Sequence, residues 1–527
     1  MSLSNSTVCN AGANDAPKMP RQIPFIIANE GCERFSFYGM RNILTVFLMT
    51  SLLLSIPEEL RKGEAKNVFH TFVIGVYFFP LLGGWLADRV FGKYNTILWL
   101  SLVYCAGHAC LAMFEHNLTG FYTGLFLIAL GSGGIKPLVA SFIGDQFDQT
   151  NRSLAQKVFD AFYWIINFGS FFASLLMPIF LKHFGASVAF GIPGILMFIA
   201  TFVFWLGRKK YVRVEPVSND PHAFLVVIRS AILSQGASRA ESRPGLYLTL
   251  LGFVLAIAGL FFIPQIGVVA ALCSALVLVM GFGGAGAWMQ LERVRGTHPD
   301  EAIDGVRNVL RLLVLFALIT PFWSLFDQKA STWVLQADHM TKPWWFESSM
   351  MQALNPLLVM ILIPFNNFVL YPLLARSGVK VTSLRRMGTG IAATGLAWIV
   401  VGGLQLEIDG GDPITIVWQI IPYALMTFGE VLVSATGLEF AYSQAPISMK
   451  GVITSFWYLS VTVGNLWVLL ANSSVKGEAV TAYIQSLGMS VTAFQMFFFA
   501  GFCLCAAGLF AMYARNYRML DNYRQAA

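Results

Sequence analysis

Charged residues are scarce in this sequence. Only 12% of its 527 residues are Asp, Glu, Lys or Arg, whereas a soluble globular domain carries about a quarter. Hydrophobic residues make up 56% of the chain, including 45 Phe and 13 Trp. This composition predicts an all-α protein with many membrane-spanning helices, and it argues against a series of soluble domains.

Motifs for metal binding, disulfide frameworks and hydrolysis are also missing. The seven Cys form no CxxC pair, and we interpret those in apolar runs (Cys105, Cys110, Cys273, Cys503, Cys505) as small packing residues. HExxH is absent, and no Ser/His or paired-Asp motif has a catalytic pattern. The sequence therefore predicts no metal, no cofactor and no enzyme activity. Because the first 22 residues are polar, no cleavable signal peptide is expected.

Long apolar runs, in contrast, are abundant. A helix needs about 20 mostly apolar residues to cross a bilayer, and 14 such segments begin near residues 23, 68, 95, 118, 157, 186, 244, 268, 309, 345, 385, 415, 450 and 490. With the N-terminus inside, the cytoplasmic connections hold 25 of the 35 Lys and Arg and the external ones hold 6. This bias predicts that both termini are cytoplasmic. Topology thus explains the net charge of +7, and no nucleic-acid partner is indicated.

The spans divide into two halves of six with a hairpin of two between them. "HAFLVVIRSAIL" predicts a short amphipathic helix at the inner surface, and "GFGGAGAW" in the hairpin is suited to close helix packing. Two such halves around a midplane site are the layout of major facilitator transporters, and "GGWLADRVFGKYNTI" resembles that superfamily's loop signature. The predicted parts are a tail (1–22), a first six-helix bundle (23–208), a linker (209–243), the hairpin (244–290), a second six-helix bundle with its leading linker (291–515) and a C-terminal tail (516–527).

Some charges lie within the predicted spans, where they are expensive and usually face a cavity or a partner. Glu30, Glu33 and Arg34 share one helix face, because they are three and four residues apart. Two carboxylates beside one guanidinium make at least one of them a candidate for protonation near neutral pH. An ion network that only locks this helix is the alternative. Both halves contain both signs, which permits pairing across the centre: Arg41, Lys136, Asp327, Lys329, Glu430 and Glu439.

Several motifs together resemble one family. "EGCERFSFYGMR" is similar to the ExxERFxYYG motif of the proton-dependent oligopeptide transporter (POT/PTR2) family. "GGIKPLVASFIGDQFD", "FYWIINFGSF", "PFWSLFDQ", "LNP" and "GLEFAYSQAPISMKGVITSFWYLSVTVGN" resemble its other hallmarks, in the same order. The hairpin and the short link "LEIDGGDP" resemble prokaryotic members. The resemblance implies a symporter that imports di- and tripeptides with protons across a bacterial inner membrane, by rocking of its two bundles within the lipid bilayer, and that works as a monomer.

The resemblance also assigns roles to residues. It implies that Arg41 and Lys136 bind the peptide carboxylate, and that Glu430, Asn167 and Asn355 bind the ammonium end. Tyr38, Tyr77 and Ser434 complete the polar contacts, while Trp323 and Trp457 form apolar walls. The residues implied in proton coupling are Glu30, Glu33, Arg34, Asp327 and His70.

Two ion pairs are expected to act as gates, Arg41 with Asp327 on the outer side and Lys136 with Glu430 on the inner side. Asp327 replaces the family's more usual Glu and is shorter by one methylene, so direct contact with Arg41 requires a closer helix approach or a bridging water. Phe37 replaces the first Tyr of YYG. His70, near the outer end of its span, is either a proton-handling residue or a surface histidine.

Other functions stay open at this point. The same fold could carry nitrate, a glucoside or an amino-acid derivative, and a receptor could bind peptide without transporting it. The full ExxER motif together with Lys136 favours peptide transport. An intramembrane peptidase is disfavoured, because the sequence contains no catalytic motif.

Overall fold

The computed structural model describes residues 19–147, 154–216, 221–234, 243–444 and 449–517. Within these ranges the protein is helical, with two isolated β-bridges and no strand. Ten helical stretches of the described chain are long and apolar enough to cross a membrane, and two of them, Leu60–Met113 and Lys157–Lys209, each contain two predicted spans. The structure is compatible with 14 spans, although that count stays a prediction.

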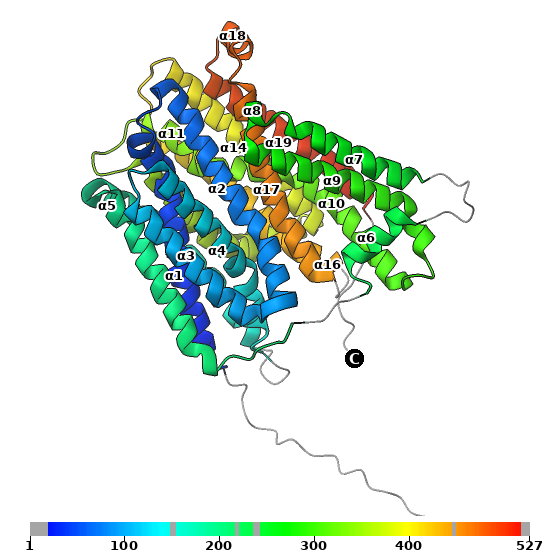
Figure 1. Ribbon diagram of the computed structural model, residues 1–527. Coiled ribbons are helices and arrows are strands. Elements are labelled where there is room, and N and C mark those ends of the chain that lie inside the picture. The colour runs from blue at the N-terminus through cyan, green and yellow to red at the C-terminus, as the bar shows by residue number, and fades with distance from the viewer. Residues whose placement is uncertain (1–18, 148–153, 217–220, 235–242, 445–448, 518–527) are drawn as a thin grey trace, which may run out of the picture.

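The first bundle contains five α-helical elements (Figure 1), with π-helical turns at the ends of the first two (Leu48–Leu52 and Ala87–Phe91): α1 (Ile23–Phe47), α2 (Glu58–Leu86), α3 (Gly92–Met113), α4 (Leu118–Gly144) and α5 (Ala155–Leu206). α5 is two helices joined at Gly185, whose φ of 81° is not helical. Glycine adopts this left-handed conformation without the steric cost of a Cβ. The break lies between the spans predicted to begin near residues 157 and 186.

The second bundle has a more interrupted helix pattern. Two predicted spans contain π-helical turns, at Asn366–Leu370 (η8) and Val431–Ala435 (η10), which the apolar periodicity did not reveal. Its helices are α10 (Asp300–Asp327), α11 (Thr332–Asp338), α12 (Leu354–Phe365), α13 (Tyr371–Arg376), α14 (Ser383–Asp409), α15 (Ile420–Glu430), α16 (Thr436–Gln444), α17 (Lys450–Ser474), α18 (Glu478–Ser486) and α19 (Val491–Arg515).

Between the bundles lie the predicted short helix and hairpin. α6 (Phe224–Leu233) confirms the short helix, and it buries Phe224 and Val227. α7 (Pro244–Leu260) and α9 (Val268–Gln290) form the hairpin through α8 (Ile263–Ile266). A Cβ at Gly245 or Gly286 would collide with the backbone of the other helix, which confirms the close packing expected from small residues. Figure 1 shows α6, α7 and α9 together at one side of the molecule, beside α10.

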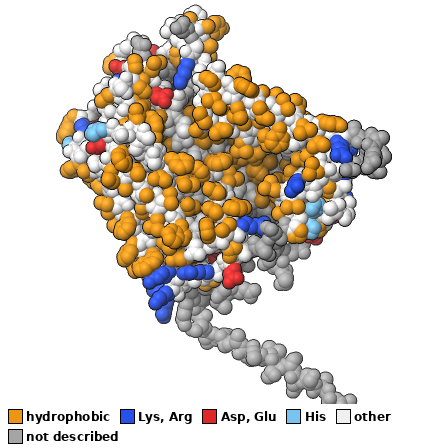
Figure 2. Space-filling model, viewed as in Figure 1, with side chains coloured by type: hydrophobic (Ala, Val, Ile, Leu, Met, Phe, Trp, Pro, Cys, Tyr) orange, Lys and Arg blue, Asp and Glu red, His pale blue; other side chains and the backbone are white. Residues whose placement is uncertain are grey.

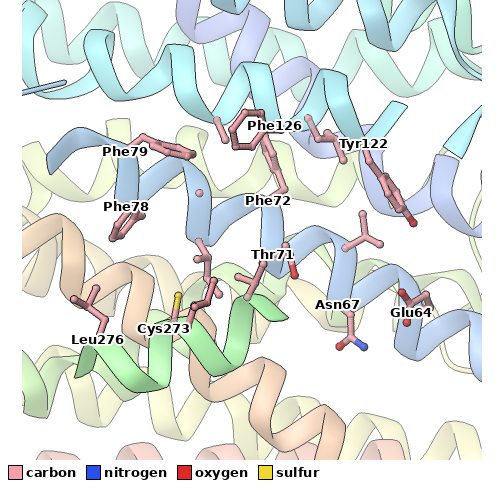
Figure 3. Close-up of a pocket in the computed structure, with 17 residues that line it drawn as sticks. Glu64, Asn67, Thr71, Phe72, Phe78, Phe79, Tyr122, Phe126, Cys273 and Leu276 are labelled. Carbon is pink, nitrogen blue, oxygen red and sulfur yellow. The ribbon is translucent and has the colours of Figure 1, made fainter. Parts of the chain in front are cut away.

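A groove separates the hairpin from the first bundle. It has a volume of about 710 Å³ and lies between α2, α4 and α9. Figure 3 shows Glu64 and Asn67 at one end of it and Phe78, Phe79 and Leu276 at the other. The N-terminal part of α9 also packs on α17 of the second bundle. Ala270 of α9 and Leu466 of α17 belong to one buried apolar cluster there.

The buried apolar residues form two main clusters, one in each bundle. α2 and α17 pack against each other where the bundles meet. On the outside, Figure 2 shows a broad band of apolar side chains over the visible face, with Lys and Arg gathered below it. This surface is that of a protein with many membrane spans. The domain boundaries at residues 208, 243 and 290 stay predictions.

Candidate functional site

Three charges of α1 form a buried network within a single helix. Arg34 Nε lies 2.6 Å from Glu30 Oε1 and 3.0 Å from Glu33 Oε2. Both glutamates are fully buried, and Arg34 is 9% exposed. Helical spacing places all three on one face, as the sequence predicted. One guanidinium therefore faces two carboxylates in a site from which water is largely excluded.

Further along α1, a second cation reaches the other bundle. Arg41 Nη2 donates to Asp327 Oδ1 at the end of α10, with a distance of 2.6 Å. Both residues are buried, at 5% and 1% exposure. Hence the shorter Asp side chain pairs with Arg41 directly, without the bridging water that its length left open. Asn465 of α17 donates to the other oxygen of Asp327 at 2.8 Å.

His70 joins the same network from α2. Its Nδ1 lies 2.6 Å from Asn465 Oδ1, and its Nε2 lies 3.0 Å from Ser331 Oγ. Because the Asn465 amide nitrogen donates to Asp327, its oxygen accepts, and His70 Nδ1 carries the hydrogen of this bond. His70 is fully buried, so the alternative of a surface histidine is wrong. Asn465 has no role in the sequence-based predictions, although it is the last residue of the motif "GLEFAYSQAPISMKGVITSFWYLSVTVGN".

Lys136 does not form the ion pair expected with Glu430. Its ammonium lies 3.6 Å from the ring centroid of Phe37 and 4.5 Å from that of Tyr77, as in cation–π contacts. α4 approaches α2 so closely that a Cβ at Gly133 would meet the Phe79 backbone, and this contact brings Lys136 to the aromatic rings of α1 and α2. In this structure the Lys136 ammonium therefore contacts aromatic rings of its own bundle. The predicted Lys136–Glu430 ion pair is wrong for this structure.

Glu430 is instead held within the second bundle. Asn355 Nδ2 donates to Glu430 Oε2 at 2.5 Å and to Thr427 Oγ1 at 3.1 Å, while Asn355 Oδ1 accepts from Lys329 Nζ at 2.8 Å. The Asn355 amide therefore connects a buried cation to a partly buried carboxylate. Lys329 is one of the charges within the predicted spans, and the sequence motifs predict no role for it. Its position two residues after Asp327 was the available signal.

The structure also places the other predicted residues. Glu430 ends α15 and Ser434 lies in the π-helical turn η10 that follows, a feature common at functional sites. The Trp323 and Trp457 rings meet edge to face at 5.8 Å. The Asn167 amide donates to the Tyr163 carbonyl of its own helix. Tyr77 stacks on Tyr458 of the second bundle, and Tyr38 meets the edge of Phe37.

Comparison with known proteins identifies the family. The family model described as "POT family" matches residues 94–485. The chain belongs to the POT family. Mouse solute carrier family 15 member 2 is 33% identical over 408 residues, which cover 74% of this chain and 50% of the mouse protein. The corresponding human protein is 33% identical over 424 residues, or 77% of this chain and 51% of its own length. The chain thus spans about half the length of the curated relatives it matches.

Solved structures of POT family members agree over most of the chain. The POT family transporter PepTSo is 72% identical with a TM-score of 0.94, and the match covers 96% of this chain and 100% of that one. A structure described as an auto-inhibited POT family peptide transporter is 66% identical with a TM-score of 0.93, over 96% and 99% of the two chains. This POT family chain therefore has the major facilitator fold.

Proposed function

We propose that the chain is a proton-coupled symporter that imports di- and tripeptides by alternating access. The observation that carries this proposal is the buried contact between Arg41 of the first bundle and Asp327 of the second. A peptide carboxylate competes with Asp327 for the guanidinium, and a proton on Asp327 removes the charge that holds it. Substrate and proton thus act on the same contact between the bundles.

The opposite end of a peptide is accommodated by the second bundle. The ammonium group replaces Lys329 as the donor to Asn355 Oδ1, beside the Glu430 carboxylate that the Asn355 amide already contacts. Within the described part of the chain, Lys136 is held by aromatic faces alone, and we take it to be available to a peptide carboxylate together with Arg41. The apolar faces of Trp323 and Trp457 suit variable side chains. This arrangement binds both termini of a short peptide and tolerates what lies between.

Proton coupling is assigned to Glu30, Glu33 and Arg34, with Asp327 and His70 as the link to the outer contact. One guanidinium balances only one of the two glutamates fully, so a proton neutralises the other. The strong excess of Lys and Arg in alternate connections supports cytoplasmic termini in a bacterial inner membrane. We assign no metal or cofactor to the transport cycle and take the monomer as the functional unit.

Uptake of labelled dialanine into liposomes tests this function. An inward proton gradient should drive accumulation, and a protonophore should abolish it. Binding without accumulation would identify a receptor. Uptake of nitrate, a glucoside or an amino-acid derivative that dialanine does not inhibit would identify a transporter of another substrate.

The pH dependence of binding tests the role of Asp327. Dialanine affinity should strengthen as pH falls, because protonation of Asp327 releases Arg41. Asp327→Asn should flatten this dependence, whereas Asp327→Glu should keep it. An Asn variant with the wild-type pH profile would show that the proton acts elsewhere.

A further inference from the structure

A polar cavity lies between the two bundles at their predicted outer end. Its volume is about 300 Å³. Lys62 and Lys66 of α2 face it from the first bundle, one helical turn apart. The second bundle contributes α11, the end of α14 and the start of α19, and its polar lining residues are Thr332, Gln336, His339, Gln405, Asp409, Ser490 and Thr492.

Lys66 has no counterion in this cavity. It is only 7% exposed, and within the described part of the chain its ammonium makes no hydrogen bond or ion pair. Two amide oxygens of the lining residues already accept a hydrogen bond each: Gln405 Oε1 from Gln336, and Gln336 Oε1 from Gln419. A buried ammonium without a partner is costly. The site therefore calls for an acceptor that the protein chain does not supply.

The remaining groups around the cavity add to its positive character. Lys62 Nζ donates to His339 Nε2 at 2.9 Å, which connects the two bundles. α19 begins at the cavity, where Ser490 caps its first turn, and a helix N-terminus favours negative charge. Asp409 is the single carboxylate in the lining, and its Oδ1 accepts from Gln405 at 2.8 Å. The cavity lining thus contains the ammonium groups of Lys62 and Lys66 and one carboxylate, that of the exposed Asp409.

We propose that this cavity binds a small inorganic anion, of the size of phosphate or chloride. The anion accepts hydrogen bonds from Lys66 and Lys62 of the first bundle and from the backbone N–H groups in the first turn of α19 in the second. There is room for the ion and several water molecules. Because both bundles contribute donors, the bound anion stabilises their contact at the predicted outer end. This site is separate from the network of Arg41 and Asp327 and does not depend on the proposed transport activity.

The test compares melting temperatures of the full-length protein in phospholipid-free detergent. Phosphate replaces gluconate at constant ionic strength. Wild type should melt about 2 °C higher in saturating phosphate, since a ligand of the folded state raises its stability. Lys66→Gln should melt at or above the wild-type temperature in gluconate, because it removes an unpaired buried charge, and phosphate should not stabilise it further. Equal stabilisation of wild type and Lys66→Gln by phosphate would overturn the proposal.

Calorimetric titration with phosphate then locates the donors. Lys66→Gln should weaken binding at least about tenfold, which corresponds to roughly 1.4 kcal/mol. His339→Gln should weaken it about threefold, because His339 holds Lys62 in place. Asp409→Asn should strengthen it by a similar factor, because it removes a negative charge that repels the anion. The exposed Lys476→Gln is the matched control and should bind as wild type does.

Three results would contradict the proposal. Unchanged binding in both His339→Gln and Asp409→Asn would show that the charge and hydrogen bonding of these groups of the second bundle do not act on the anion. Loss of stability in Asp409→Asn with no phosphate effect on wild type would make Asp409 the partner of Lys66. Stabilisation by phosphatidylglycerol in mixed micelles, but not by phosphate or chloride, would make the ligand a lipid headgroup instead of a small anion.

Discussion

The two halves of α1 use their polar groups in different ways. In the half that we predict to lie toward the cytoplasm, Glu30, Glu33 and Arg34 bond to one another. In the other half, Arg41 and Thr45 bond to the second bundle, at Asp327 and at the Ala330 carbonyl. The Asn42 carbonyl likewise accepts from Gln352. One helix therefore combines a network internal to itself with a set of contacts between bundles.

This difference indicates how α1 can stay stable when the two bundles separate at one of its ends or at the other. The network near the start of α1 needs no partner from the second bundle, so the bundles can separate there without exposing an unpaired charge. At the other end, separation must break a buried ion pair, which is strongly unfavourable unless another ligand replaces a partner. In the proposed cycle, peptide and proton supply these replacements.

The largest effect is expected at the internal network. Glu33→Gln removes one ionisable carboxyl while it keeps the size and burial of the side chain. We expect gradient-driven accumulation of dialanine to be lost completely and exchange between equal peptide pools to continue. Liposome uptake and counterflow measure the two activities.

Glu439→Gln is the matched control, since Glu439 is also within a span but is exposed on α16. It should accumulate peptide as wild type does. Full accumulation by Glu33→Gln would show that the network only locks α1 and that coupling resides at the outer contact.

The next effect concerns the two predicted gate pairs. A double-mutant cycle with Arg41→Ala and Asp327→Ala should give a coupling free energy of about 3 kcal/mol, because each single change leaves a buried charge unpaired. The same cycle for Lys136→Ala and Glu430→Ala should give less than about 0.5 kcal/mol, since the two residues have separate partners. Thermal unfolding in detergent measures both. Strong coupling of Lys136 and Glu430 would mean that the protein in solution favours a bundle arrangement in which these two residues form the predicted inner ion pair.

A smaller effect is expected within the second bundle. Lys329→Ala leaves the Asn355 oxygen without its donor, and Glu430→Gln removes the charge at the other end of the bridge. Because Asn355 lies between the two charges, their coupling should be about 1 kcal/mol, below that of Arg41 and Asp327. Asn355→Ala should remove this coupling. If it persists in the Asn355→Ala background, Lys329 and Glu430 interact without the amide.

Much of this arrangement could be predicted from the sequence, and the predictions that were wrong or incomplete have physical causes. Helical spacing on α1 fixed the internal network, because all three of its members belong to one helix. The Arg41–Asp327 pair followed from family resemblance, but only the structure gives the helix separation that lets Asp327 reach. Lys136 was assigned the wrong partner because the aromatic faces of Phe37 and Tyr77 compete for its ammonium. Similarly, the bridge through Asn355 depends on the packing of α12 against α15, which residue spacing does not determine.

The smallest effect is expected at the exposed rim of the outer contact. Lys182 of α5 lies 2.6 Å from Glu347 of the second bundle, with the two side chains 47% and 29% exposed. Water competes for both charges there, so Lys182→Ala should lower the free energy of unfolding by less than about 1 kcal/mol. The difference should vanish in 1 M salt, where the Debye length is about 3 Å, whereas the coupling of the buried Arg41–Asp327 pair should persist. The coupling free energy of Lys182 and Glu347 could instead equal that of Arg41 and Asp327 and persist in 1 M salt. This result would place the main interaction between the bundles at the surface. The contrast between the two halves of α1 would then no longer explain where the bundles are held together.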